Sequence, residues 1–383
     1  MYRNTYVEVS LDNIRHNIKI IKEKYKYKYY IGVVKGNAYG HGYGIIKTLI
    51  DEGINFLAVS NLDEALEVRE IDKNVGILCL EPIDIKYMDI CHENNISICV
   101  NDYDYYLELC RLKYKLKIHL KIDSGMNRLG FDKKEEIDKV YKDIKEHNNL
   151  YLEGIFSHFA TSGVYDKSYD NQLARFKELT KDVDLDKIEI VHIDRSVTMC
   201  VHEKINFVNG IRLGIIMYGF EAMPSGGSGL RVKLRNIKWN SIRKIKDISF
   251  TIPYVPLGLK PAFTLVSEVL QVKDVKKGDY VGYGTLYQAK EDMKIAVIDI
   301  GYADGINRRR MNSNMEINGA LYPIIGDICM GMTILKVDDK VKKHDKVIVI
   351  GDKISIRKIA NHMNTTHYEV MAMIDSSIPR RYI

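Results

Sequence analysis

A lysine directly after an apolar run is the first residue of this chain that could carry out chemistry. Lys35 follows Ile31–Val34 and begins the segment KGNAYGHG, which contains three glycines. A lysine at the end of a buried strand is expected to lose part of its hydration, which lowers its pKa and suits it to Schiff-base formation and proton transfer. The glycines would let the backbone approach a phosphate group. The alternative is a lysine that extends its amine to solvent, and position alone leaves both open.

Two arginines stand in settings that demand a polar partner. Arg212 lies inside the apolar stretch Gly210–Ile215, where a guanidinium without an acceptor would be prohibitively costly. Arg128 lies in the turn-rich segment Lys121–Gly130, directly after another apolar run. Together with Lys35, these arginines predict a cationic cup of the size of a phosphate group.

Two other polar residues also follow apolar runs. His158 comes near the end of Gly154–Phe159, and Ser196 comes shortly after Ile188–Ile193. A single histidine beside an apolar strand is more often a hydrogen-bonded core residue than a catalyst. The sequence pattern therefore leaves both interpretations of His158 open.

The elements that must position these residues recur as short, β-branched runs with amphipathic segments between them, a pattern typical of βα units. Eight runs close a (β/α)₈ barrel, whose active site lies at the C-terminal ends of its strands. That is where the residues above fall. The runs are Ile31–Val34, Phe56–Val59, Gly76–Leu80, Ile96–Val100, Leu116–Ile122, Leu152–Ser157, Ile188–Ile193 and Phe207–Leu213.

The spacers between the runs are predicted helices. Residues 12–24 repeat isoleucine along one helix face, with Ser10 as N-cap. Residues 62–70 follow Asn61, which forms a predicted capping box with Glu64.

A Pro, Ser and Gly segment at 224–229 predicts a linker, after which the pattern changes. We predict a barrel domain over 1–235 and a mainly β domain over 236–383. The runs Leu265–Val272, Ile295–Ile300 and Lys346–Ile350 would be strands of the second domain, and Tyr6–Val9 could add another.

Composition excludes several classes of protein. The net charge of +6 is spread over 383 residues, which argues against a nucleic-acid partner. The six cysteines show no zinc-ligand spacing, so no metal is expected and they are interpreted as reduced core residues. The N-terminus lacks the features of a secretory signal, and no run is long enough for a membrane span. We therefore expect a cytoplasmic protein.

The segment VVKGNAYGHG resembles the cofactor-lysine motif of the bacterial alanine racemase family, fold type III of the enzymes that depend on pyridoxal 5'-phosphate. The resemblance extends over essentially the whole chain. It implies that Lys35 carries the cofactor as a Schiff base. The groups that it implies for the cofactor phosphate are Tyr39, Ser196, Tyr368 and the backbone of Gly214 and Ile215.

The resemblance also assigns roles around the cofactor ring. Arg212 matches the arginine that faces the pyridine nitrogen, and His158 matches the histidine packed on the ring. Arg128 matches the residue that contacts the substrate carboxylate side, and Lys121 matches a lysine that is carbamylated in many members. An arginine at the pyridine nitrogen keeps it unprotonated, which weakens the ring as an electron sink and discourages transamination.

In the second half, GDYVGYGT resembles the motif whose tyrosine is the second catalytic base, here Tyr283. IDIGYADG and GDICM resemble two more active-site stretches, in which Tyr302 lines the entrance and Met330 offers backbone to the substrate carboxylate. The resemblance implies interconversion of L- and D-alanine by a two-base mechanism with Lys35 and Tyr283, in a homodimer with shared active sites. The product, D-alanine, is a peptidoglycan precursor.

Two positions depart from the family pattern. Arg195 replaces the usual Asn before the phosphate serine, and Gly331 replaces the usual Asp after Ile-Cys-Met. Both put the preference for alanine over serine or a larger amino acid in doubt. An amino-acid decarboxylase of the same architecture should lack the catalytic tyrosine matched by Tyr283. A non-catalytic carrier of pyridoxal phosphate resembles the barrel alone, which leaves the second-domain motifs unexplained.

Overall fold

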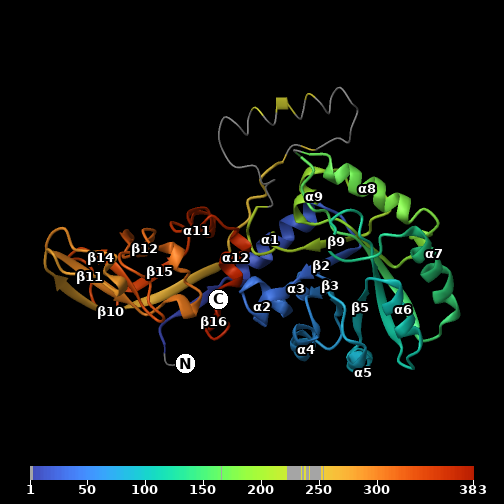
Figure 1. Ribbon diagram of the computed structural model, residues 1–383, viewed down its shortest axis with the longest axis horizontal. Helices are drawn as coiled ribbons and strands as arrows, with labels where there is room; N and C mark the ends of the chain where they lie inside the picture. The colour runs from blue at the N-terminus through green and yellow to red at the C-terminus, as the bar shows by residue number, and fades with distance from the viewer. Residues whose placement is uncertain are drawn as a thin grey trace. The chain divides into compact units, whose positions relative to one another are not determined.

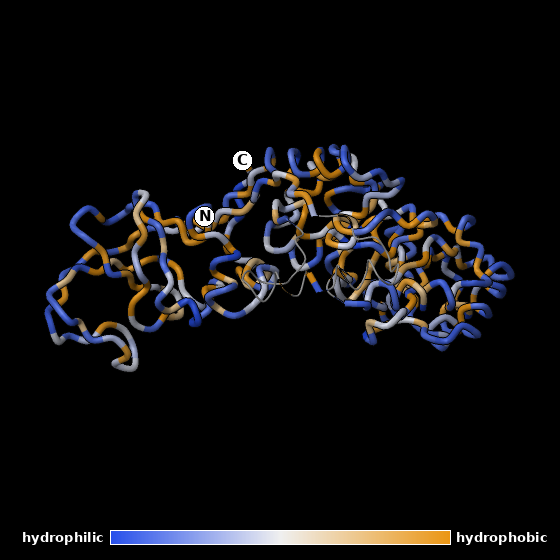
Figure 2. Tube along the Cα trace, turned by 90° about the horizontal axis from the view of Figure 1, so that it is seen from above, coloured by the Kyte–Doolittle hydropathy of each residue, from blue (hydrophilic) through white to orange (hydrophobic). Residues whose placement is uncertain are grey.

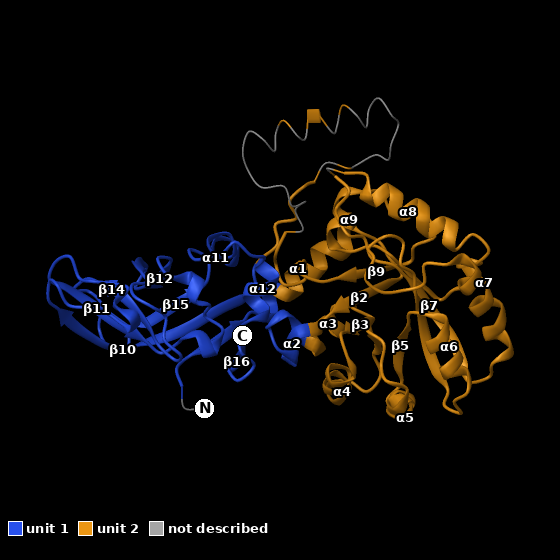
Figure 3. Cartoon of the chain, viewed as in Figure 1, with its two compact units in different colours: residues 1–13, 36–45, 261–383 blue, residues 14–35, 46–260 orange. Residues whose placement is uncertain are grey.

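The computed structural model describes residues 3–164, 166–221, 234, 237–238, 241, 252 and 254–383. Contacts between Cα atoms divide the chain into two compact units (Figure 3). Unit 1 comprises residues 1–13, 36–45 and 261–383, and unit 2 comprises residues 14–35 and 46–260. The predicted linker at 224–229 and the boundary at 235/236 lie outside the described residues. The units differ from two consecutive segments, because residues 1–13 and 36–45 group with the C-terminal part of the chain.

Unit 2 contains an eight-stranded parallel sheet, in the order β8-β7-β6-β5-β4-β3-β2-β9. All eight strands predicted from the apolar runs are confirmed, with small shifts at their ends. The strands are β2 (Tyr29–Val33), β3 (Phe56–Val59), β4 (Gly76–Cys79), β5 (Ile96–Val100), β6 (Leu116–Lys121), β7 (Leu150–Phe156), β8 (Ile190–His192) and β9 (Gly210–Leu213).

The two end strands of this order also meet. Arg195, just after β8, forms a parallel bridge with Arg212 of β9, and the backbone N–H of Arg212 lies 3.4 Å from the carbonyl oxygen of Asp194. The sheet is therefore a nearly closed barrel, as the count of eight runs predicted. Its strands are buried on both faces, which explains why they are apolar throughout rather than alternating.

Helices surround this barrel (Figure 1). The Asn61 side chain accepts the N–H of Glu64 at 3.0 Å, as expected of an N-cap, whereas the Glu64 carboxylate accepts the N–H of Ser60 at 2.8 Å, one residue earlier than a standard capping box. The helices are α1 (Leu11–Lys24), α3 (Ile46–Asp51), α4 (Leu62–Ile71), α5 (Met88–Glu93), α6 (Tyr103–Cys110), α7 (Lys134–Asp143), α8 (Ser168–Leu179) and α9 (Ser196–Val201), with the 3₁₀ turns η2 (Ile85–Tyr87), η3 (Ile144–Glu146) and η4 (Leu185–Lys187).

Unit 1 is mainly β. Its long strand β10 (Phe263–Val275) pairs with β1 (Tyr6–Val9), β11 (Met293–Ile298) and β15 (Lys346–Ile350), all antiparallel. The remaining strands are β12 (Asn314–Ile317), β13 (Ala320–Pro323), β14 (Thr333–Val337) and β16 (Arg380–Tyr382). The other elements are α2 (Lys35–Tyr39, of which Lys35 belongs to unit 2), α11 (Ile356–Met363), α12 (His367–Ala372), η1 (Tyr43–Ile45), η5 (Tyr283–Thr285), η6 (Tyr302–Asp304) and η7 (Arg308–Arg310).

Hydrophobic residues run through the inside of each unit, and hydrophilic residues gather at the outer turns (Figure 2). Among the described residues, no helix is both long enough and apolar enough to cross a membrane.

Candidate active site

Lys35 follows β2 and Val34, where the chain enters a left-handed turn. The backbone angle φ is 62° at Gly36 and 52° at each of Asn37, Ala38 and Tyr39. Glycine adopts this conformation readily, whereas for an L-residue it costs about 1–2 kcal/mol. The turn is closed by a hydrogen bond from the N–H of Gly40 to the carbonyl oxygen of Gly36 at 3.0 Å. The chain therefore leaves β2 sharply, and Lys35 is half-buried instead of fully buried.

Two of the predicted phosphate-binding residues meet in unit 1. The rings of Tyr39 and Tyr368 lie with centroids 5.9 Å apart and planes tilted by 53°. Burial, and to a lesser degree the neighbouring Tyr368, raises the pKa of Tyr39. Its hydroxyl is therefore protonated at neutral pH and can donate a hydrogen bond to an anion.

The other predicted phosphate contacts meet in unit 2. The Ser196 hydroxyl oxygen accepts the backbone N–H of Gly214 at 3.2 Å, and only 8% of Ser196 is exposed. In the part of the chain that the structure describes, the backbone N–H of Ile215 has no acceptor, although this residue is 2% exposed. A buried N–H without an acceptor is costly, and an anion beside the Ser196 hydroxyl would satisfy it.

Arg212 is buried, as predicted, and its acceptors are now identified. The guanidinium donates to the carbonyl oxygens of Ser157 at 2.6 Å and Ile193 at 3.1 Å, and also to that of His192. It also donates to Nδ1 of His192 at 2.7 Å and lies 3.3 Å from Nδ1 of His158. Burial lowers the pKa of Arg212 to about 9, against the effect of Asp194, so the side chain stays charged at neutral pH.

His158 lies beside this charge. Burial, followed by the charge of Arg212 and then those of three other cationic groups, holds the pKa of His158 well below its usual value. The imidazole is therefore neutral, and its Nδ1 faces the guanidinium of Arg212 as an acceptor. His158 and the core residue His192 thus both contact the buried arginine, and the role of His158 stays a prediction.

Lys121 ends strand β6 with its amine 5.0 Å from the centroid of the Phe156 ring. Only 5% of the residue is exposed. Burial, and then the charges of Arg212 and Arg128, lowers the pKa of Lys121 to about 8. Arg128 is exposed and lies in a tight loop, where its backbone N–H donates to the Asp123 carboxylate at 2.9 Å. Part of the Lys121 population is thus an uncharged amine at neutral pH.

The remaining predicted residues belong to unit 1. The N–H of Ala303 donates to the carbonyl oxygen of Met330 at 2.9 Å, which joins the stretches of Tyr302 and Met330. Tyr283 is 71% exposed, Met330 62% and Tyr302 44%. Several neighbours in sequence are also exposed and apolar. We call this set the tyrosine surface: Tyr280, Tyr283, Leu286, Tyr302, Met330 and Met332.

Of the two departures from the family pattern, Arg195 caps α9, where its backbone N–H donates to the Thr198 hydroxyl at 3.0 Å. Gly331 lies in the open, since a Cβ built there would meet no atom within 4 Å. Packing therefore does not require glycine at 331.

Comparison with known proteins agrees with this arrangement. The family description "Alanine racemase, N-terminal domain" matches residues 9–222, and "Alanine racemase, C-terminal domain" matches residues 262–382. The chain belongs to the alanine racemase family. Alanine racemase of Listeria innocua is 36% identical over 392 aligned residues, which cover 100% of this chain and 98% of that protein.

Solved structures of the same architecture support this membership. The alanine racemase of Bacillus anthracis, with bound L-Ala-P, has a TM-score of 0.86 at 32% identity and covers 100% of this chain and 96% of its own. A histidine racemase of Leuconostoc mesenteroides subsp. sake has a TM-score of 0.84 at 25% identity, with coverage of 100% and 98%. The chain is accordingly an amino-acid racemase, an isomerase. The fold alone does not select the amino acid.

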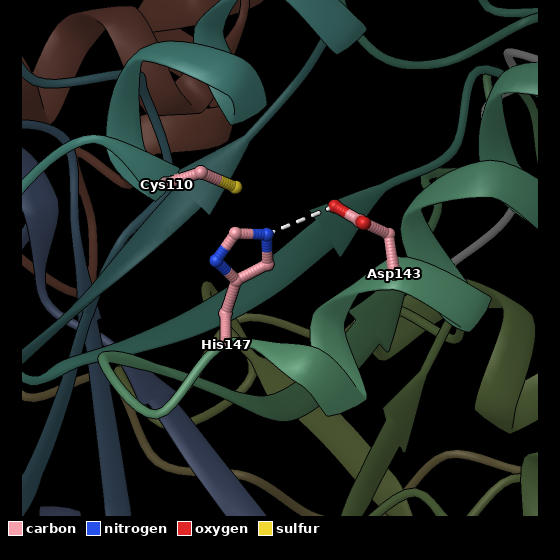
Figure 4. A group of neighbouring side chains, drawn as sticks. All are labelled: Cys110, Asp143 and His147. Carbon is pink, nitrogen blue, oxygen red and sulfur yellow. Dashed lines mark hydrogen bonds and ion pairs between the residues drawn. The ribbon is translucent and has the colours of Figure 1, made fainter.

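One cluster of metal-ligand type lies in the described residues, away from the residues above. Cys110, Asp143 and His147 face one another where α6 and α7 end (Figure 4). His147 Nε2 lies 3.1 Å from the Asp143 carboxylate, which also accepts the Tyr106 hydroxyl at 2.9 Å. Burial raises the pKa of the Cys110 thiol. Hydrogen bonds thus join Asp143 to both His147 and Tyr106.

Sequence reasoning missed the residues behind Arg212. His192, His119 and Glu153 are buried in the barrel. They form a line of hydrogen bonds that starts at the Arg212 guanidinium. Their signal was present as single polar residues inside the strand runs. Nothing local distinguished these residues from polar side chains at the barrel surface.

Proposed function

We propose that the enzyme interconverts L- and D-alanine with pyridoxal 5'-phosphate as cofactor. The observation that carries this proposal is the group around Arg212: a buried, charged guanidinium beside the neutral imidazole of His158. The donor set fits the cofactor, since the Ser196 hydroxyl and the N–H of Ile215, which has no acceptor among the described residues, suit a phosphate dianion. Tyr39 and Tyr368 would complete that phosphate site, and the backbone N–H of Gly214 would hold the Ser196 hydroxyl in place.

Pyridoxal phosphate, when bound, supplies an electron-withdrawing ring that makes the proton on the substrate Cα acidic. Lys35 would hold the cofactor covalently until the substrate displaces it. The charge of Arg212, facing the pyridine nitrogen, would keep that nitrogen unprotonated and so limit transamination. His158 would pack against the ring in its neutral form.

Racemisation requires one group on each face of Cα, since one must remove the Cα proton from its face and the other must return a proton to the opposite face. Lys35 would move the proton on the D face and Tyr283 the proton on the L face. Arg128 and the backbone of Met330 would bind the substrate carboxylate, and Tyr302 would line the entrance. A carbamylated Lys121 would orient Arg128, because a carbamate accepts hydrogen bonds from a guanidinium.

The tyrosine surface supports a homodimer. Tyr283 is 71% exposed, and the large side chains of Tyr280 and Leu286, which are near it in sequence, are exposed as well, as expected of residues that a partner covers. In the proposed dimer, Tyr283 of each chain serves the Lys35 site of the other chain. We further infer that the enzyme works in the cytoplasm, where it would supply D-alanine for peptidoglycan.

Chiral chromatography of products from each common L-amino acid tests the substrate. We expect alanine to be racemised fastest. Histidine and serine are the most informative substrates to compare with alanine. A histidine racemase has a similar fold, and a Cβ at position 331 would meet no atom within 4 Å. If the enzyme racemised histidine or serine but not alanine, the assignment of alanine as substrate would be wrong. Borohydride reduction of the cofactor-loaded protein should fix the cofactor on Lys35, and a Lys35→Arg variant should remain unlabelled. Attachment to another lysine would refute the assignment.

A further inference from the structure

The barrel interior contains a line of buried polar side chains that leads away from Arg212. Nη1 of Arg212 lies 2.7 Å from Nδ1 of His192, and Nε2 of His192 lies 3.0 Å from Nδ1 of His119. Nε2 of His119 lies 3.0 Å from the Glu153 carboxylate. All four residues are at most 4% exposed. We call this set the interior relay: Arg212, His192, His119 and Glu153.

We propose that Glu153 is a positioning residue for Arg212 and acts on it through two neutral histidines, each fixed in one tautomer. The hydrogen bonds of the interior relay permit only one arrangement of protons. What this does for catalysis rests on the proposed function, because only there does Arg212 face the cofactor ring.

The proton positions follow from the arginine end. A guanidinium has donors only, so Nδ1 of His192 must accept its hydrogen bond. A neutral His192 then carries its proton on Nε2 and donates it to Nδ1 of His119. His119 in turn carries its proton on Nε2 and donates it to Glu153. Protonating either histidine would place two hydrogens in one contact.

Packing holds both rings in this line. A Cβ at Gly154 would lie 2.2 Å from Nδ1 of His119, so the His119 ring occupies the space that this glycine leaves. The His192 ring stacks on Phe156 with centroids 4.8 Å apart and planes 7° apart. A ring flip would be needed to exchange the positions of Nδ1 and Nε2 in this line of hydrogen bonds. Neither ring can flip without displacing a neighbouring residue.

The charge at the far end is anchored. The Ser97 hydroxyl donates to the Glu153 carboxylate, and the Lys117 amine lies 3.3 Å from it. Burial raises the pKa of Glu153, but the hydrogen bonds that His119 and Ser97 donate, together with the charge of Lys117, lower it. Glu153 is therefore an anion that polarises both imidazoles towards the positive charge of Arg212.

Nitrogen NMR of the cofactor-free protein, labelled with ¹⁵N-histidine, tests the interior relay directly. Assignment would use His119→Asn and His192→Asn. We expect both histidines as neutral Nε2–H tautomers. A cationic ring, or an Nδ1–H tautomer at either position, would overturn the proposal. This measurement needs no variant of Glu153, and it does not depend on the cofactor.

Glu153→Gln tests the coupling, since it keeps the shape and removes the charge. We expect the ¹⁵N signals of His119 and His192 both to move, and racemisation kcat to fall by about tenfold with KM unchanged, because charge-assisted hydrogen bonds are roughly twice as strong as neutral ones. The control, Glu178→Gln, removes an exposed carboxylate paired with Lys181 and should move neither signal. A His192 signal unchanged in Glu153→Gln would refute the coupling and leave the proposed function standing.

Discussion

The hydroxyl oxygen of Ser196 and the backbone N–H of Gly214 form a hydrogen bond of 3.2 Å between two segments that follow neighbouring barrel strands. It joins the end of β8 to the end of β9. If an anion binds there, the hydroxyl proton of Ser196 is directed to it while its oxygen continues to accept from Gly214.

Ser196→Ala should therefore weaken binding of pyridoxal phosphate by about tenfold or more, because a hydrogen bond to a charged group contributes about 1.5–3 kcal/mol. Titration of the cofactor-free protein, followed by absorbance, measures the Kd. Ser376→Ala at an exposed position is the matched control and should leave the Kd unchanged. Equal affinities for the two variants would place the phosphate elsewhere.

Two glycines of the left-handed turn should respond very differently to alanine. A Cβ at Gly40 would lie 2.4 Å from the carbonyl oxygen of Met371, whereas a Cβ at Gly36 would meet nothing within 4 Å. Gly36→Ala should lower the free energy of unfolding by only about 1–2 kcal/mol, the cost of the left-handed conformation. Gly40→Ala should cost several-fold more. Urea unfolding distinguishes them, and equal losses would contradict the backbone contact.

Stability should decline as the pH falls below neutrality. Burial lowers the pKa of His41 to about 4, against 6.5 in the unfolded chain. The unfolded state binds the proton first, so the stability is complete above pH 6.5 and is lost as the pH falls towards 4. Between about pH 7 and pH 5, the loss from this group should reach about 2 kcal/mol. Urea unfolding at both pH values should show that the free energy of unfolding falls by about 2 kcal/mol less in His41→Asn than in the wild type. The same dependence on pH in both proteins would contradict the assignment.

Lys121 should form a carbamate. Its amine, with a pKa of about 8, is partly uncharged at neutral pH and can attack CO₂, forming an N–C bond and releasing a proton. Incubation with ¹³C-bicarbonate should produce one slowly exchanging carbamate signal in the carbon NMR spectrum, stronger at pH above the pKa. Lys121→Ala should lack it, whereas Lys117→Ala should retain it. A spectrum without such a signal in the wild type would show that Arg128 is oriented by another group.

Mixed dimers should reveal whether active sites are shared. Lys35→Ala and Tyr283→Phe are each expected to be inactive. After dissociation and random reassociation, about half the dimers are mixed, and each has one intact site, so activity should return to roughly a quarter of wild type. A mixture that demonstrably exchanges subunits and stays inactive would refute shared sites but not the two-base chemistry.

The sequence predicted the strands of the barrel well because each is buried on both faces and so appears as a continuous apolar run. Phe56–Val59 and Ile96–Val100 are reproduced without change. The ends of β2 and β9 were less accurate, since pairing with a neighbour decides where a strand stops. The surroundings of Arg212 were predicted in kind, as buried acceptors, but not by residue.

Other features could not be read from local sequence. The left-handed turn passes through Ala38 and Tyr39, which have no preference for positive φ. It is held by the hydrogen bond from Gly40 to Gly36 and by the close approach of Gly40 to Met371. The tautomers of His119 and His192 likewise depend on residues from separate strands.

The contact between Gly154 and the His119 ring couples the variation allowed at two positions on neighbouring strands. A library that randomises position 154 alone should return glycine almost exclusively, because even a methyl group would overlap the imidazole. A library that randomises both positions should recover larger residues at 154 wherever position 119 has become small. In variants of this enzyme, substitutions at positions 154 and 119 would therefore occur as a pair.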